Sequence, residues 1–395
     1  MSLSRNITVA SWRAFFGMFL VIVPVLVPYW RSLGLSMHEV LEIQALFGLA
    51  MVLLEVPTGY IADLFGRKIS VVLGGLISGL TFTFLPFART YNELVIYEIA
   101  LALAATLVSG AEDAIVYESI PAAVNRRKII GSFRVWSLSG ETLAALLAGV
   151  LVMYSFELVV WAQAIVGWAP FCFALLLIEP PRSAMVESTH TGRIAKVFSH
   201  VLVEDSLTRL IFINYVVWGL SSFCVVWLLQ EYWTQVGVPL PYFGVIWAAL
   251  MAASAIVSKY VHVIEHRIGA AGTLAVIALA PISGYLLMGY APPVVGITAG
   301  VLFYITRGLS YVVFQDAFNW RIPSSYRATA NSLLSLCFRL GFVPIGPLLG
   351  TVIDTRGMTT ALGGLALAFG VCGVVLMLPL IKRLDEMHVH EIPSQ

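Results

Sequence analysis

The stretch Glu55-Val56-Pro57-Thr58-Gly59-Tyr60-Ile61-Ala62-Asp63-Leu64-Phe65-Gly66-Arg67-Lys68 lies between two long apolar runs of the chain. Its last part, from Asp63 to Lys68, places a carboxylate, a glycine and two cations where one run ends and the next begins. We expect this stretch to form a loop at a membrane surface, where Gly66 permits a tight reversal. Gly59 is expected to remove a side chain where two helices approach closely.

The composition around this stretch predicts an integral membrane protein. Of the 395 residues, 59% are hydrophobic and only 11% are charged, and the mean hydropathy is +0.90. A membrane-spanning helix needs about 20 apolar residues. The sequence contains twelve such runs, at about 10–30, 39–62, 69–88, 94–119, 131–154, 158–178, 207–232, 241–264, 270–290, 294–319, 329–353 and 359–381. The first run is too long for a secretory signal and lacks a small-residue cleavage site, so it is expected to remain as a helix.

Basic residues predict the orientation. If the N-terminus is cytoplasmic, sixteen Lys and Arg fall in the inside loops and ends, and only Arg31, Arg89 and Arg356 fall outside. This asymmetry satisfies the positive-inside rule. We therefore expect a multi-pass protein of a bacterial cytoplasmic membrane with both termini in the cytoplasm.

A polar connection at about 179–206 divides the runs into two sets of six. We expect an N-terminal bundle at 1–180, a central cytoplasmic loop at 181–205 and a C-terminal bundle at 206–395. A short internal repeat agrees with this division. Ile120-Pro121, a basic cluster and an apolar run match Ile322-Pro323, Tyr326-Arg327 and another apolar run, at an offset near 200.

These features together resemble the major facilitator superfamily of secondary transporters. The resemblance rests on the two sets of six runs, the polar connection and the motif Gly59-x-x-x-Asp63-x-x-Gly66-Arg67-Lys68. It implies an all-α membrane protein of twelve transmembrane helices in two pseudo-symmetric bundles, working by alternating access. The second-half counterpart of the motif is degenerate and reads Glu265-His266-Arg267-Ile268-Gly269.

The resemblance implies a cytoplasmic gate at the motif. Asp63 would face the N-terminal end of the eleventh helix, where unpaired N–H groups favour a carboxylate. Arg67 would pair with Glu118 at the cytoplasmic end of the fourth helix. The alternative is a plain turn, and Lys68 equally fits the positive-inside rule alone.

Ionisable residues within the apolar runs are candidates for the substrate and proton pathway, because charges in a membrane are costly unless paired or hydrated. In this superfamily the fourth, fifth, tenth and eleventh helices line the central cavity. The candidates on these runs are Glu112, Asp113, Arg134, Glu141, Arg307, Asp316 and Arg339. Adjacent helical residues point about 100° apart, so one of Glu112 and Asp113 is expected to face the pathway and the other a neighbouring helix. The alternative is a set of structural ion pairs between helices.

Aromatic residues are frequent in the seventh and tenth runs. Most are expected to pack or to lie at the membrane interface. Trp218 and Tyr311 lie nearer the middle of their runs and are candidates for lining a cavity that takes a partly aromatic or amphipathic substrate.

We expect a proton-coupled secondary transporter of a small organic solute, with efflux of an amphipathic compound preferred. The fourth run lacks the arginine of drug/proton exporters and the fifth lacks their Gly-Pro signature, while Gly346-Pro347 occurs in the eleventh. One alternative is therefore a proton-coupled importer of an anionic nutrient or metal chelate, in which Arg307 and Arg339 bind carboxylates. A lipid or lysolipid flippase is a further alternative.

Other classes find no support in the sequence. The sequence contains no GxxxxGK[ST] loop, so ATP-driven transport is not expected. It contains no catalytic constellation that would indicate an enzyme. The four cysteines lie in four different runs and the seven histidines form no ligand pattern, so no metal or cofactor is expected. The expected partners are a small-molecule substrate, protons and the lipid bilayer, with no nucleic acid, and the chain is expected to be a monomer.

Overall fold

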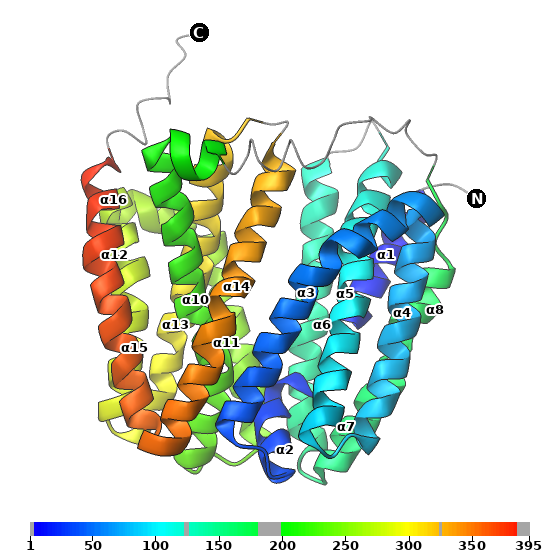
Figure 1. Cartoon of the computed structure of the whole chain (residues 1–395), viewed down its shortest axis with the longest axis horizontal. Coiled ribbons are helices and arrows are strands. Elements are labelled where there is room, and N and C mark those ends of the chain that lie inside the picture. The colour runs from blue at the N-terminus through cyan, green and yellow to red at the C-terminus, as the bar shows by residue number, and fades with distance from the viewer. Residues whose placement is uncertain (1–3, 122–125, 181–198, 324–325, 385–395) are drawn as a thin grey trace. The chain divides into compact units, whose positions relative to one another are not determined.

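The computed structural model describes residues 4–121, 126–180, 199–323 and 326–384. These residues form helices joined by short connections, and no strand occurs among them (Figure 1). The chain divides into two compact units, one of Met1–Met185 with Gly237–Ala248 and one of Val186–Val236 with Ala249–Gln395. The first unit thus takes in the beginning of α11.

The first unit begins with an interrupted helical segment, made of α1, η1 and α2, and continues with longer helices. The elements are α1 (Ser4–Gly17), η1 (Val23–Val25), α2 (Leu26–Ser32), α3 (Met37–Phe65), α4 (Arg67–Phe84), η2 (Leu85–Phe87), α5 (Tyr91–Ser119), α6 (Arg126–Leu151), α7 (Phe156–Val166) and α8 (Ala169–Leu175). Helix α5 packs on α3 and α4, and α1 packs on α6 and α8.

The second unit holds the remaining helices, apart from the first part of α11. Its elements are η3 (His200–Glu204), α10 (Ser206–Gln235), α11 (Pro241–Lys259), α12 (Val261–Tyr290), α13 (Pro293–Arg321), α14 (Arg327–Arg356), α15 (Met358–Cys372), η4 (Gly373–Met377) and α16 (Leu378–Lys382). Helix α13 packs on α10 and α12, α12 packs on α15, and α10 packs on α14.

Ten helical segments in the described part of the chain are long and apolar enough to cross a membrane, in place of the twelve expected. The two expected runs outside this set are 10–30 and 131–154. The first is broken after Gly17, and Pro24, which has no backbone N–H, stands at the start of a short 3-10 helix. The second forms the single helix α6, whose hydropathy is lowered by Arg134 and Glu141.

The stretch 55–68 is not the loop that the sequence suggested. Helix α3 continues through Phe65, α4 begins at Arg67, and only Gly66 lies outside both helices. A capping box at Ser36 and Glu39 starts α3. Gly66, with φ 107° and ψ 151°, ends it in a conformation that is open almost only to glycine. A single residue therefore makes the reversal.

The backbone of the internal repeat is the same in both units. Gly269 lies 203 positions after Gly66 and has φ 73° and ψ 167°, so the degenerate second motif keeps the turn of the first. Helices α5 and α13 end at Ile120 and Ile322, which adopt nearly the same extended conformation 202 positions apart. Each precedes a proline, which disfavours helical geometry in the residue before it.

Candidate functional site

The turn at Gly66 is held by charged side chains from two other helix ends. Arg67 forms an ion pair with Glu118, near the end of α5. The backbone N–H groups of Arg67 and Lys68 donate to the carboxylate of Glu179, at 2.9 and 2.6 Å. A carboxylate satisfies the free N–H groups at the start of α4 and is favoured there by the helix dipole. We call this ion pair and this cap together the Arg67 latch. The latch ties the start of α4 to the end of α5 and to Glu179, which follows α8 in the chain.

Two predictions about the motif concern contacts that its own unit does not provide. Within this unit, no heavy atom lies within 4 Å of the position that a Cβ at Gly59 would occupy, so a close approach of another helix at this glycine stays a prediction. One close approach inside the unit is found at Gly74, where a Cβ would lie 2.8 Å from the carbonyl oxygen of Ala104. Asp63 is exposed on α3. Its contact with the eleventh helix, and with it the gating role of the motif, stays a prediction.

Glu112 is buried on α5 and makes a bidentate ion pair with Arg13 of α1. Nε and the Nη2 group of Arg13 each donate to one carboxylate oxygen of Glu112. The two residues are only 7% and 6% exposed. Because an uncompensated buried charge is costly, each side chain requires the other. Arg13 was missing from the residues predicted from sequence, although it lies inside an apolar run and the rule applied to the other intramembrane charges would have found it.

Asp113, the next residue, is exposed. Glu112 is thus turned to a neighbouring helix, as expected for one of the two acids, and that Asp113 faces the pathway stays a prediction. Arg13 and Arg134 are the charged residues that act electrostatically on Asp113. Arg134 is exposed on α6, and Glu141 lies half-buried about two turns further along the same helix. Two cations, Arg13 and Arg134, and two acids, Glu112 and Asp113, thus interact electrostatically across α1, α5 and α6.

The charges of the second unit are more dispersed. Arg307 and Tyr311 are exposed one turn apart on α13, and the Arg307 guanidinium lies 5.9 Å from the ring centroid of Tyr304. Nine residues separate Asp316 from Arg307, which places them about 180° apart around the helix. Asp316 lines a cavity bounded by α10, α12 and α13. Arg339 is half-buried on α14, with Nε 3.4 Å from the Ser335 hydroxyl.

Trp218 does not line an open cavity as predicted. It is 0% exposed, its ring N–H donates to the Asn214 side-chain oxygen at 3.0 Å, and its ring packs on Phe369. Its position near the middle of α10 could not reveal which face of the helix is buried. Trp218 is therefore a core residue of the second unit.

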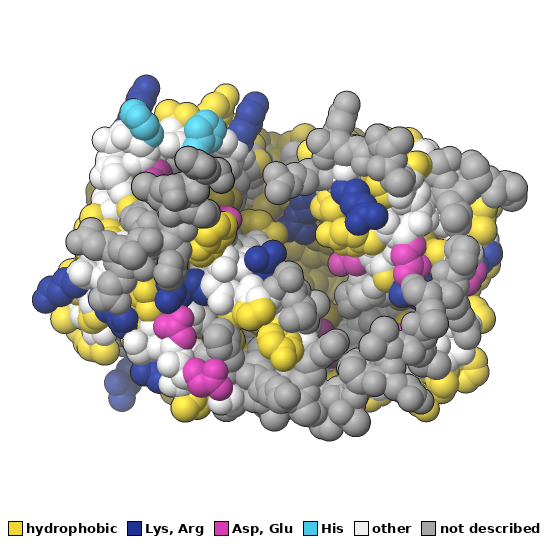
Figure 2. Space-filling model, turned by 90° about the horizontal axis from the view of Figure 1, so that it is seen from above, with side chains coloured by type: hydrophobic (Ala, Val, Ile, Leu, Met, Phe, Trp, Pro, Cys, Tyr) yellow, Lys and Arg dark blue, Asp and Glu magenta, His cyan; other side chains and the backbone are white. Residues whose placement is uncertain are grey.

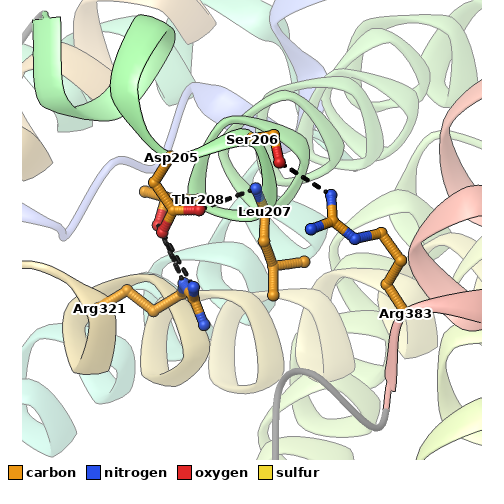
Figure 3. A network of polar contacts seen from close by, with 6 residues as sticks. All are labelled: Asp205, Ser206, Leu207, Thr208, Arg321 and Arg383. Atoms are coloured by element: carbon orange, nitrogen blue, oxygen red, sulfur yellow. Dashed lines mark hydrogen bonds and ion pairs between the residues drawn. The ribbon is translucent and has the colours of Figure 1, made fainter.

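A polar network closes the end of the second unit at which α10 begins (Figure 3). Asp205 caps α10 through the Leu207 N–H and accepts from Arg321, at the end of α13, at 2.9 Å. Arg383 donates to Ser206 at 3.1 Å. Partial burial opposes ionisation of Asp205, but the hydrogen bonds from Thr208, Arg321 and the Leu207 amide prevail and lower its pKa to about 2.

In the first unit, the neutral side chain of Asn6 joins the corresponding helix ends. Asn6, near the start of α1, donates to the Ser119 hydroxyl at 3.0 Å and to the Ile178 carbonyl at 2.8 Å. These contacts join the start of the first helix to the ends of α5 and of the chain after α8. Neither network could be predicted from sequence, because each joins residues more than 100 positions apart.

Comparisons with known proteins agree with this architecture. The model of the Major Facilitator Superfamily matches residues 7–343. An uncharacterized MFS-type transporter, YxaM of Bacillus subtilis (strain 168), is 23% identical over 374 residues, which cover 91% of this chain and 90% of that protein. The crystal structure of the nucleoside transporter NupG has a TM-score of 0.78 at 15% identity, covering 98% of this chain and 100% of that one. A D-xylose-proton symporter has a TM-score of 0.67 at 15% identity, covering 96% and 98%.

At these identities the solved structures share the fold alone. The match to the family model extends over most of the chain, from α1 into α14, and includes both the Gly66 turn and the residues of the Arg13–Glu112 pair. The proteins compared here are transporters and not enzymes. The chain therefore belongs to the Major Facilitator Superfamily and is a multi-pass membrane protein, a secondary transporter of that type.

Proposed function

We propose that the protein couples proton movement to transport of a small organic solute, and that its direction is efflux of an amphipathic compound. The observation that carries the coupling is the buried Arg13–Glu112 pair beside Asp113. When Glu112 takes up a proton, its charge disappears and Arg13 is left buried without an anion. Such a state costs several kcal/mol unless the guanidinium finds another partner.

Asp113 interacts electrostatically with the same cation and is the partner that Arg13 would take up. It lies about 100° further around α5, so moving Arg13 toward it requires α1 and α5 to shift relative to each other. Proton uptake at one carboxylate thereby becomes a rearrangement of helices inside the first unit. Release of the proton restores the original pair and reverses the rearrangement.

The preference for an amphipathic solute rests on the second unit. Tyr311 presents an exposed aromatic ring one turn from the Arg307 guanidinium, which suits a solute with an apolar body and a polar group. The same guanidinium favours a second candidate, uptake of an anionic nutrient, because it can bind a carboxylate in bidentate geometry.

We propose further that the Arg67 latch holds one face of the first unit shut and that Asp63 completes this gate toward the second unit. The distribution of Lys and Arg supports placing that face in the cytoplasm of a bacterial cell, with the protein in the cytoplasmic membrane. We propose that the monomer is the working unit, since each bundle of the fold is contributed by the same chain.

Counterflow in proteoliposomes tests the solute class. Vesicles loaded with a lipophilic amine, a nucleoside, a pentose or a dicarboxylate are diluted into the same labelled compound, and the transported class accumulates label transiently. An imposed pH gradient is then applied to the compound that gave counterflow. Accumulation driven against its gradient by movement of protons the other way supports efflux, and accumulation together with protons favours the importer. Transport that ignores the pH gradient contradicts the proposal.

A further inference from the structure

The second unit contains a cavity of about 700 Å³ bounded by α10, α12 and α13. Its apolar wall includes Ile211, Leu274 and Val313, of which Ile211 and Leu274 are almost completely buried. Glu265 and Asp316 also line it. Figure 2 looks onto the end of the unit where these segments lie, and acidic, basic and histidine side chains gather there among apolar ones. The volume is in the range of small-molecule sites, about 300–1,000 Å³.

The corresponding place in the first unit is filled. The two glycine turns are 203 positions apart, and this offset matches Leu274 with Val71. The two Ile-Pro helix ends are 202 positions apart, and this offset matches Val313 with Ala111 and Ala317 with Ile115. Val71, Ala111 and Ile115 belong to one buried apolar cluster. The cavity is therefore specific to the second unit and is not a general feature of the repeated bundle.

Three differences between the units account for it. Ala317 is smaller than Ile115, its counterpart, and leaves space at the centre. Glu265 stands where α3 has Ala62, which packs against the filled cluster, and Asp316 stands where α5 has Ala114. Where the first unit has packed apolar side chains, the second unit thus has empty space and two carboxylates.

The ionisable side chains that line the cavity are the two acids Glu265 and Asp316, the cation Arg321 and His266, so with a neutral histidine the balance is negative. Arg321 also lines it, but its guanidinium is engaged by Asp205. Glu265 and Asp316 have no hydrogen bond or ion pair with any described residue. The helix that restarts at Ala270 presents a positive end of only about half a unit charge, which two carboxylates outweigh. An anion is therefore disfavoured here.

We propose that this cavity is a binding site for a soluble amphipathic organic cation. The cationic group would lie against Glu265 and Asp316, with the face of Trp320, which lines the same cavity, as a further contact for it. The apolar part would pack among Ile211, Leu274 and Val313. The site differs from the proposed transport pathway, because Asp316 lies on the opposite side of α13 from Arg307 and Tyr311. It requires neither proton coupling nor a particular direction of transport.

Equilibrium binding of radiolabelled tetraphenylphosphonium to the full-length protein in phosphatidylcholine nanodiscs tests this proposal, with empty nanodiscs subtracted. Tetraphenylborate, of the same shape and opposite charge, is the matched competitor. We expect E265Q/D316N to weaken binding at least tenfold. A317I, which restores the side chain of the first unit, should weaken it similarly by filling the space, and E157Q, an exposed carboxylate outside the cavity, should leave it unchanged.

Thermal unfolding of each variant establishes that it is folded before binding is compared. Wild-type affinity in both E265Q/D316N and A317I would overturn the site. Competition by tetraphenylborate as strong as that by unlabelled tetraphenylphosphonium would overturn the cationic specificity. Loss of binding when phosphatidylethanolamine is included would assign the cavity to an amine-bearing lipid and contradict a soluble ligand.

Discussion

Arg13 of α1 and Glu112 of α5 neutralise each other inside the first unit, with two hydrogen bonds between them and almost no exposure of either side chain. The pair joins helices 99 positions apart in sequence. Among the described residues of this unit, this is the buried ion pair at which uptake of one proton would remove the negative charge and leave the positive one.

Removing one partner should destabilise the protein far more than removing both. R13M and E112L each leave one buried charge unpaired, and each should cost about 3–5 kcal/mol of unfolding free energy. The double variant R13M/E112L should recover most of this loss, because two apolar side chains of similar size can replace the pair. Unfolding in mixed micelles measures the cycle. Additive losses in the double variant would show that the two side chains are not coupled.

The two glycine turns should be equally intolerant of a side chain. G66A and G269A place alanine at positive φ with extended ψ, which costs about 1–3 kcal/mol at each position. The matched control is G364A, a helical glycine with no heavy atom within 4 Å of its Cβ position and no positive φ. Thermal unfolding should separate the first two variants from the third. A G269A protein as stable as the control would contradict the equivalence of the two turns.

Protonation of Asp205 should weaken the network at the start of α10. The pKa of Asp205 in the folded protein, about 2, is below its ordinary value of 3.8, so its stabilising effect is complete above about pH 4 and is lost as pH falls toward 2. We expect wild type to be more stable than D205N at pH 7 and the difference to shrink as pH is lowered to 3. A difference that is independent of pH over this range would rule out the carboxylate charge as its source.

Asp63 should matter for transport and not for folding. D63N removes a charge from an exposed side chain, so the variant should reach the membrane with wild-type yield and thermal stability while its transport falls severely. E55Q, eight residues earlier on the same helix, is the matched control and should transport normally. Normal transport by D63N would remove this residue from the gate.

Much of the fold follows from local sequence. Apolar runs predicted α3, α5, α10 and α13 within a few residues, since runs of this length have few alternatives to a spanning helix. The repeat predicted equivalent helix ends, which Ile120 and Ile322 form. Where polarity and proline interrupt a run, as around Pro24, hydropathy alone did not locate the break.

The site was predicted less completely, because its members meet across distances that sequence does not encode. Intramembrane position flagged Glu112 but did not identify Arg13 as its partner. The helix period places Asp316 and Arg307 on different sides of α13. The cavity beside Asp316 depends on the small side chain of Ala317, and only the comparison with the filled cluster of the first unit shows this. Glu179 looked like the start of a polar linker and instead caps α4.

The central claim, that proton binding at Glu112 drives transport, is tested most directly with E112Q in proteoliposomes, once counterflow has identified a solute. Gln has the same shape as Glu but takes up no proton. The account predicts that E112Q retains counterflow of the solute while accumulation driven by a pH gradient falls to the level of protein-free vesicles, and that E157Q behaves as wild type. Accumulation by E112Q at the wild-type level under the same gradient would contradict it.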